Sequence, residues 1–108
     1  MQIELYIDGE KKIFTTPIVP MLAKRKYLEI MARAEKKAEE NENYIPSHEE
    51  QLEEEDELIG ILANVVFGGQ FTVEQVYNGA SDEYVYEKLR EAVFGKKKVN
   101  SEGNNQGK

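Results

Sequence analysis

The side chains with the most evident chemical potential are a lone histidine and the acidic run that follows it. His48 is the only histidine, and seven carboxylates lie between residues 49 and 57. Paired carboxylates can perform acid and base catalysis or bind a hard cation. Catalytic pairs need unequal surroundings that drive their pKa values apart, whereas a hydrophilic run at a helix start offers uniform solvent. We therefore expect no catalytic residue, no metal site, no cofactor and no enzyme.

Other classes of function are disfavoured by composition. Cysteine is absent, so disulfides, thiolate zinc sites and cysteine nucleophiles are excluded, which favours the cytoplasm. The net charge of −7 opposes binding to a phosphate backbone, so we expect no nucleic-acid partner. The longest apolar run, over 61–67, is far shorter than the roughly 20 residues that span a membrane. Residues 1–4 lack the start of an export signal, and we expect no membrane association.

The charges are unevenly placed along the chain. Basic residues gather over 24–37 and again over 96–98, whereas the acidic run lies between them. One interpretation is that these are solvated helix faces. The other is that the acidic run meets the basic face of the first helix, within the chain or across a subunit contact.

A β-hairpin is predicted at the start of the chain. Ile3, Leu5 and Ile7 alternate with polar residues, the pair Asp8-Gly9 supplies turn chemistry, and a second β-prone run follows. A lone hairpin is marginal in water. We therefore expect its apolar face to lie on the helices that follow.

A helix of about five turns is predicted from residue 21, after prolines at 17 and 20 that end the strand. Apolar residues at spacings of four and three draw one stripe along it: Tyr27, Met31, Ala34 and Ala38, widened by Leu28 and Ile30. The segment over 41–46 breaks this helix. Tyr44 and Ile45 are candidates to anchor that loop to the body.

Three further helices are predicted in the rest of the chain from residues that begin and end helices. A second long helix, polar in its first half and apolar in its second, is predicted up to the Gly68-Gly69 pair. A short helix and a last helix follow, and the last helix carries an apolar stripe. The capping residues are Ser47 with Glu50, Thr72 with Gln75, Ser81, and the closing glycines Gly79 and Gly95.

The predicted fold is mainly α with an N-terminal β-hairpin, an α+β domain of about four helices over residues 1–95. Residues 96–108 are basic and then rich in Asn, Gly and Gln, and are interpreted as a disordered tail. The helices over 72–94 share one feature with a helix-turn-helix. However, Asp82 and Glu83 open the second of them, where acids would repel phosphates.

Three segments together resemble tail assembly chaperones of long-tailed (siphovirus-type) bacteriophages. They are the start Ile3-Glu4-Leu5-Tyr6-Ile7-Asp8-Gly9-Glu10-Lys11-Lys12 with Phe14-Thr15-Thr16-Pro17, the helix end Val65-Val66-Phe67-Gly68, and Gly69-Gln70-Phe71-Thr72 with Tyr77-Asn78-Gly79. Their order and separations match as well. The resemblance covers most of residues 1–94, whereas the match over 35–57 is to length and acidity.

The resemblance implies a partner and a location. Such chaperones bind the long, aggregation-prone tape measure protein in the host cytoplasm and are absent from the mature virion. Candidate contact residues, for which core packing is the alternative use, are Met21, Met31, Val85, Leu89 and Val93. A homo-oligomer is compatible with the sequence. The rival interpretation is an acidic interaction or inhibitor protein that mimics nucleic acid.

The resemblance also implies a second product. In this family a longer form commonly arises by ribosomal frameshifting and adds a domain implied to recruit tail tube protein. The candidate frameshift region is Gly95, Lys96, Lys97 and Lys98, a peptide that an A-rich slippery site could encode.

Overall fold

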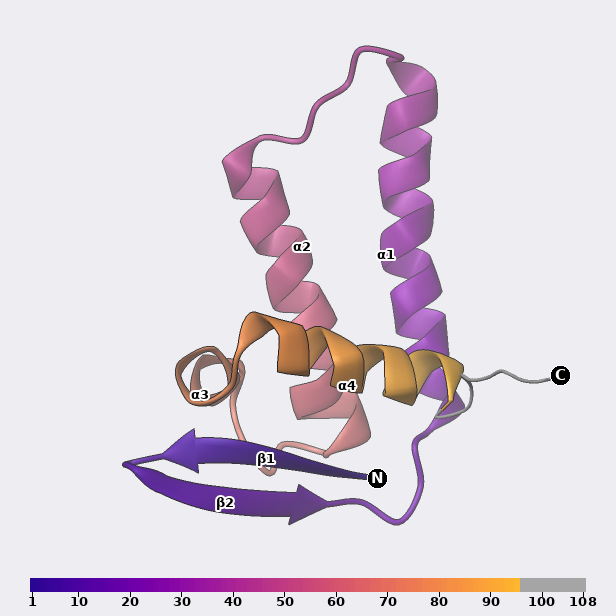
Figure 1. Cartoon of the computed structure of the whole chain (residues 1–108). Coiled ribbons are helices and arrows are strands. Elements are labelled where there is room, and N and C mark those ends of the chain that lie inside the picture. The colour runs from indigo at the N-terminus through magenta and orange to yellow at the C-terminus, as the bar shows by residue number, and fades with distance from the viewer. Residues whose placement is uncertain (96–108) are drawn as a thin grey trace, which may run out of the picture.

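A computed structural model describes residues 1–95 and places a β-hairpin beneath a group of helices (Figure 1). The elements are β1 (Gln2–Ile7), β2 (Glu10–Thr15), α1 (Met21–Glu40), α2 (His48–Gly60), the π-helix η1 (Ile61–Val66), α3 (Val73–Gly79) and α4 (Asp82–Phe94). The predicted α+β class with an N-terminal hairpin is confirmed. The predicted tail over 96–108 lies outside the described residues.

The hairpin forms because its turn residues accept the required backbone conformation. Asp8 and Gly9 have φ values of 54° and 79°, and a two-residue turn of this kind needs positive φ at both positions. The strands pair antiparallel, with Ile7 opposite Glu10. Ile3 and Leu5 are fully buried, so the apolar face of the hairpin lies on the helices, as predicted.

The core is centred on the junction of α2 and η1. The predicted single helix is an α-helix that continues as a π-helix, in which the Phe67 N–H donates to the Leu62 carbonyl at 3.0 Å. This i to i−5 bond marks the wider turn of a π-helix. Buried residues from every helix and from β1 form one cluster around this junction. Gly68 and Gly69, with φ values of 59° and 84°, end the helical segment.

Helices α1 and α2 form a projecting arm, joined at its far end by the loop over 41–47 (Figure 1). In α1 the buried residues are Ala23 and Ile30, whereas Leu28 is 51% exposed and Ala38 is exposed. The predicted stripe is therefore wrong at these two positions. Leu28 lies on a side of α1 that does not meet the body, and Ala38 lies in the last turn of α1, at the far end of the arm (Figure 1). Ile45 is 83% exposed, so its predicted anchoring role is also wrong.

The capping residues act locally. Ser47 with Glu50 and Thr72 with Gln75 form both hydrogen bonds of a capping box, and the Ser81 hydroxyl accepts from the Tyr84 N–H. Gly95 follows α4 with a φ of 89°.

Gly79 is the last residue of α3 and has a different reason for its identity. It is buried against β1, where a Cβ would lie 2.5 Å from the Tyr6 carbonyl oxygen. Close packing, not a left-handed turn, therefore requires glycine here.

Candidate functional site

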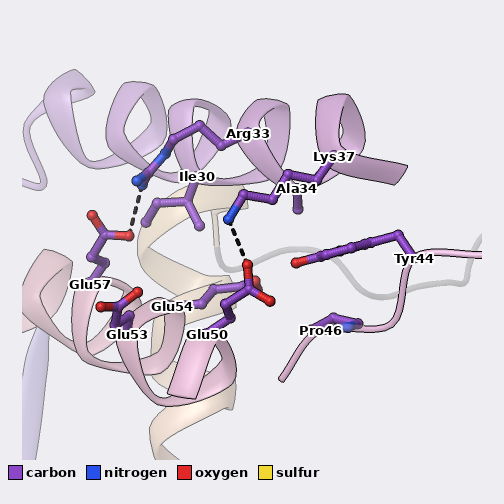
Figure 2. A pocket seen from close by; sticks show the side chains of 10 residues that line it. All are labelled: Ile30, Arg33, Ala34, Lys37, Tyr44, Pro46, Glu50, Glu53, Glu54 and Glu57. Carbon is purple, nitrogen blue, oxygen red and sulfur yellow. Dashed lines mark hydrogen bonds and ion pairs between the residues drawn. The ribbon is translucent and has the colours of Figure 1, made fainter. Parts of the chain in front are cut away.

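The arm contains a small cleft of about 90 Å³ between α1 and α2 (Figure 2). Helix α1 supplies basic and apolar side chains, α2 supplies carboxylates, and the loop covers one end. The lining residues are Ile30, Arg33, Ala34, Lys37, Tyr44, Pro46, Glu50, Glu53, Glu54 and Glu57. The cleft thus brings part of the acidic run opposite the basic side of the first helix.

Two ion pairs span this cleft. Arg33 Nη2 lies 2.7 Å from Glu57 Oε1, and Lys37 Nζ lies 3.0 Å from Glu50 Oε2 (Figure 2). The interpretation that the acidic run meets the basic face of α1 within the chain is confirmed for these pairs. All four side chains remain partly exposed, and such surface pairs contribute only about 0–1 kcal/mol each.

Three groups at one end of the cleft, Glu50, Lys37 and Tyr44, shift one another's pKa values. The backbone N–H of Ser47, then Lys37 and Tyr44, lower the pKa of Glu50 to about 2. The hydrogen bond and charge of Glu50 raise the pKa of Lys37. Desolvation, then Glu50, raises the pKa of Tyr44. At neutral pH these three groups are therefore a carboxylate, an ammonium and a neutral phenol, which suits a structural contact.

Other carboxylates of the acidic run fasten α2 to the helices below it. The Tyr77 hydroxyl donates to Asp56 Oδ1 at 2.7 Å, and the Tyr86 hydroxyl donates to Glu55 Oε2 at 2.9 Å. Desolvation and then the hydrogen bond to Glu55 raise the pKa of Tyr86 to about 12. Sequence reasoning missed these contacts, although tyrosines lying off an apolar stripe are a signal that a hydroxyl has a polar partner.

The predicted contact residues divide into buried and accessible groups. Val85, Leu89 and Val93 are buried in the core, which corrects their assignment as a partner surface. They face inward because α4 lies across the bases of α1 and α2 (Figure 1). Met21 is 89% exposed, whereas Met31 is half-buried.

Met21 and Met31 belong to a larger apolar face. Leu28 lies seven residues after Met21 and three before Met31, so all three occupy one side of α1. Phe94, which is 60% exposed, adjoins this side of α1 through Tyr27. The Tyr27 and Phe94 rings lie edge to face, with 5.4 Å between their centroids. We call the set Met21, Leu28, Met31 and Phe94 the outer stripe.

The other candidate features are a histidine, a metal site, a membrane-spanning helix and the frameshift region. His48 is exposed at the start of α2. Within residues 1–95, no group of three or more His, Asp or Glu side chains is arranged to hold a metal ion. Among the helices that the structure describes, none is long and apolar enough to cross a membrane. Lys96, Lys97 and Lys98 lie outside the described residues.

The fold and the arm define a small α+β protein that presents an ion-paired cleft and an apolar helix face. The chain belongs to the family described as phage tail chaperone protein, whose sequence model matches residues 1–107. The resemblance to phage tail assembly chaperones is thereby confirmed, and it assigns the chain a chaperone role in tail assembly. No curated protein and no solved structure matches the chain.

Proposed function

We propose that this chaperone binds the tape measure protein and keeps it soluble until the tail tube assembles around it. The family supports the chaperone role, and the outer stripe is the observation that supports a surface for an apolar helix. Met21, Leu28 and Phe94 all expose at least half of their surface. Methionine adapts its shape to varied apolar partners, and exposed apolar patches mark interaction sites.

The proposal also covers where the chain acts and which partners it does not bind. The chain acts without catalysis in the host cytoplasm of a siphovirus-type phage and is absent from the mature virion. It binds neither nucleic acid nor membrane, and self-association is compatible with this role.

The single buried cluster supports treating residues 1–95 as one domain.

Co-expression with the tape measure protein of the same phage tests the proposal. We expect wild-type chain to move the tape measure protein into the soluble fraction, and Met21→Glu and Leu28→Glu to reduce that recovery. The matched control is Leu52→Glu, because Leu52 is 61% exposed on α2 and lies outside the outer stripe. Equal recovery with all three variants would remove the outer stripe from the proposal.

The rival function is an acidic inhibitor that mimics nucleic acid. The internal pairing of Glu50 with Lys37 and of Glu57 with Arg33 counts against it, because these carboxylates already have cationic partners. Binding to a DNA-binding protein that weakens steeply with salt would support the rival. Binding to apolar helices that persists at high salt concentration would support the chaperone function.

We also propose that a longer, frameshifted form recruits tail tube protein. Expression from the native DNA with its downstream sequence, an N-terminal tag and intact-mass measurement tests this. We expect a second product whose sequence diverges within residues 95–98. Detection of the 108-residue product alone would contradict frameshifting and leave the tape measure proposal to stand on the co-expression result.

A further inference from the structure

A second, wider groove of about 370 Å³ lies between α1 and the junction of α2 with η1. Apolar side chains from three elements line it, namely Ile30 of α1, Ile61 and Val65 of η1, and Val73 of α3. The same groove is bordered by charged residues of α1 and α2. An apolar surface with a charged border fits one face of an amphipathic helix.

Gly60 lies in this groove and has no reason for its identity inside the molecule. Its φ of −59° is helical, and a Cβ there would meet only the Asn64 side-chain nitrogen, at an ordinary 3.6 Å. Glycine within a helix is less favourable than alanine. Gly79, by contrast, has no room for a Cβ, because the backbone of Tyr6 lies too close. A glycine that the fold does not need, on the wall of an open groove, permits close approach by a second backbone.

The border of the groove carries one carboxylate without a cationic partner. Glu29 is paired with Lys26, and Glu57 with Arg33. Asp56 accepts a hydrogen bond from Tyr77 but has no ion pair with any cation among residues 1–95. The groove therefore retains negative charge on its α2 side, and a basic residue on the occupant would complement it.

We propose that this groove receives one amphipathic helix of the tape measure protein, an inference that rests on the proposed function. The helix crosses α2 at Gly60 with a small residue and packs its apolar face on the half-buried Val65 and Val73, above the buried Ile30 and Ile61. It places a lysine or arginine beside Asp56. The outer stripe and the groove then lie on different sides of α1, so that the arm contacts its partner with both.

Steric variants of Gly60 test the groove in co-expression with the full-length tape measure protein. Gly60→Leu projects into the groove, and we expect about a tenfold loss of co-purified tape measure protein. Ala38→Leu is the control, because Ala38 is exposed on α1 away from the groove, and it changes recovery by less than about twofold. Gly60→Ala keeps or raises the melting temperature and still weakens recovery, which separates occlusion from misfolding.

The charge of Asp56 gives a second test. Asp56→Asn retains an acceptor for Tyr77 but removes the carboxylate, and we expect its complex to dissociate at lower NaCl concentration than wild type. Glu49→Gln is the matched control on the same helix, outside the groove. If both Gly60 variants and Asp56→Asn recover as much tape measure protein as wild type does, the groove is not its binding site. If wild-type chain itself recovers no tape measure protein, the proposed function fails instead.

Discussion

Gly79 and Tyr6 lie in direct backbone contact where α3 crosses β1. A Cβ on residue 79 would approach the Tyr6 carbonyl oxygen to 2.5 Å and its nitrogen to 3.0 Å. Both obstructing atoms belong to the backbone of a paired strand, so they cannot move aside as a flexible side chain would. This contact joins the hairpin to the helical part of the chain.

Gly79→Ala is therefore expected to destabilise the protein by about 1–3 kcal/mol, the usual range for overpacking. Gly60→Ala is the matched control, since the same methyl meets only ordinary contact there. It should stabilise by up to about 1 kcal/mol through helix propensity. Urea denaturation of both variants measures the two effects. Similar values for both would show that the hairpin shifts freely against α3.

The Tyr84 hydroxyl joins α4 to β1 by accepting a hydrogen bond from the Glu4 N–H at 2.9 Å. Tyr84→Phe leaves that partly buried N–H without its partner, and we expect a loss of about 0.5–1.5 kcal/mol. Tyr6→Phe is the control, because Tyr6 is exposed and its hydroxyl has no hydrogen bond among the described residues. Thermal unfolding of the two variants should therefore differ, and hydrogen exchange at Glu4 should quicken only in Tyr84→Phe.

Glu50 should make stability depend on acid pH. Its folded-state pKa is lowered from 4.5 to about 2, first by the Ser47 N–H and then by Lys37. Its contribution is therefore complete above about pH 4.5 and is lost as the pH falls toward 2. Glu50→Gln should be less stable than wild type at neutral pH, with the difference closing across that window. A constant difference from pH 7 to pH 2, measured by urea denaturation, would contradict this linkage.

The Arg33–Glu57 ion pair should contribute little to stability despite its short distance of 2.7 Å. Both side chains are substantially exposed, and we expect a coupling energy below about 1 kcal/mol. A double-mutant cycle with Arg33→Ala and Glu57→Ala measures it. The coupling should shrink further in high salt, because exposed pairs are screened. A large, salt-independent value would mean that the cleft is drier than its exposure indicates.

Features set by neighbouring residues could be predicted well. Asp8 and Gly9 specify the hairpin turn, and Ser47 with Glu50 specifies a helix start, because each device involves residues within a few positions of one another. The chaperone family follows from short segments in a fixed order, and it is confirmed over residues 1–107. Binding of the tape measure protein stays a prediction, which the co-expression experiment decides.

Features set by distant partners could not be predicted. Helical periodicity places Leu28 in the buried stripe of α1, yet Leu28 lies on the outer stripe, because periodicity gives the apolar side of a helix but not which part of it meets the body. The assignment of Val85 to a partner surface is wrong for a related reason, since only the position of α4 against α1 and α2 determines that it is buried.

By itself, the sequence determined the order of the elements, their capping residues and the family, since these depend on residues close together in the chain. Only the tertiary structure decided that Glu57 meets Arg33, that Gly79 meets Tyr6, and that Gly60 lies beside an open groove. Each of these relationships joins elements far apart in the chain. Their geometry depends on how the helices pack around the shared core, which local patterns do not specify.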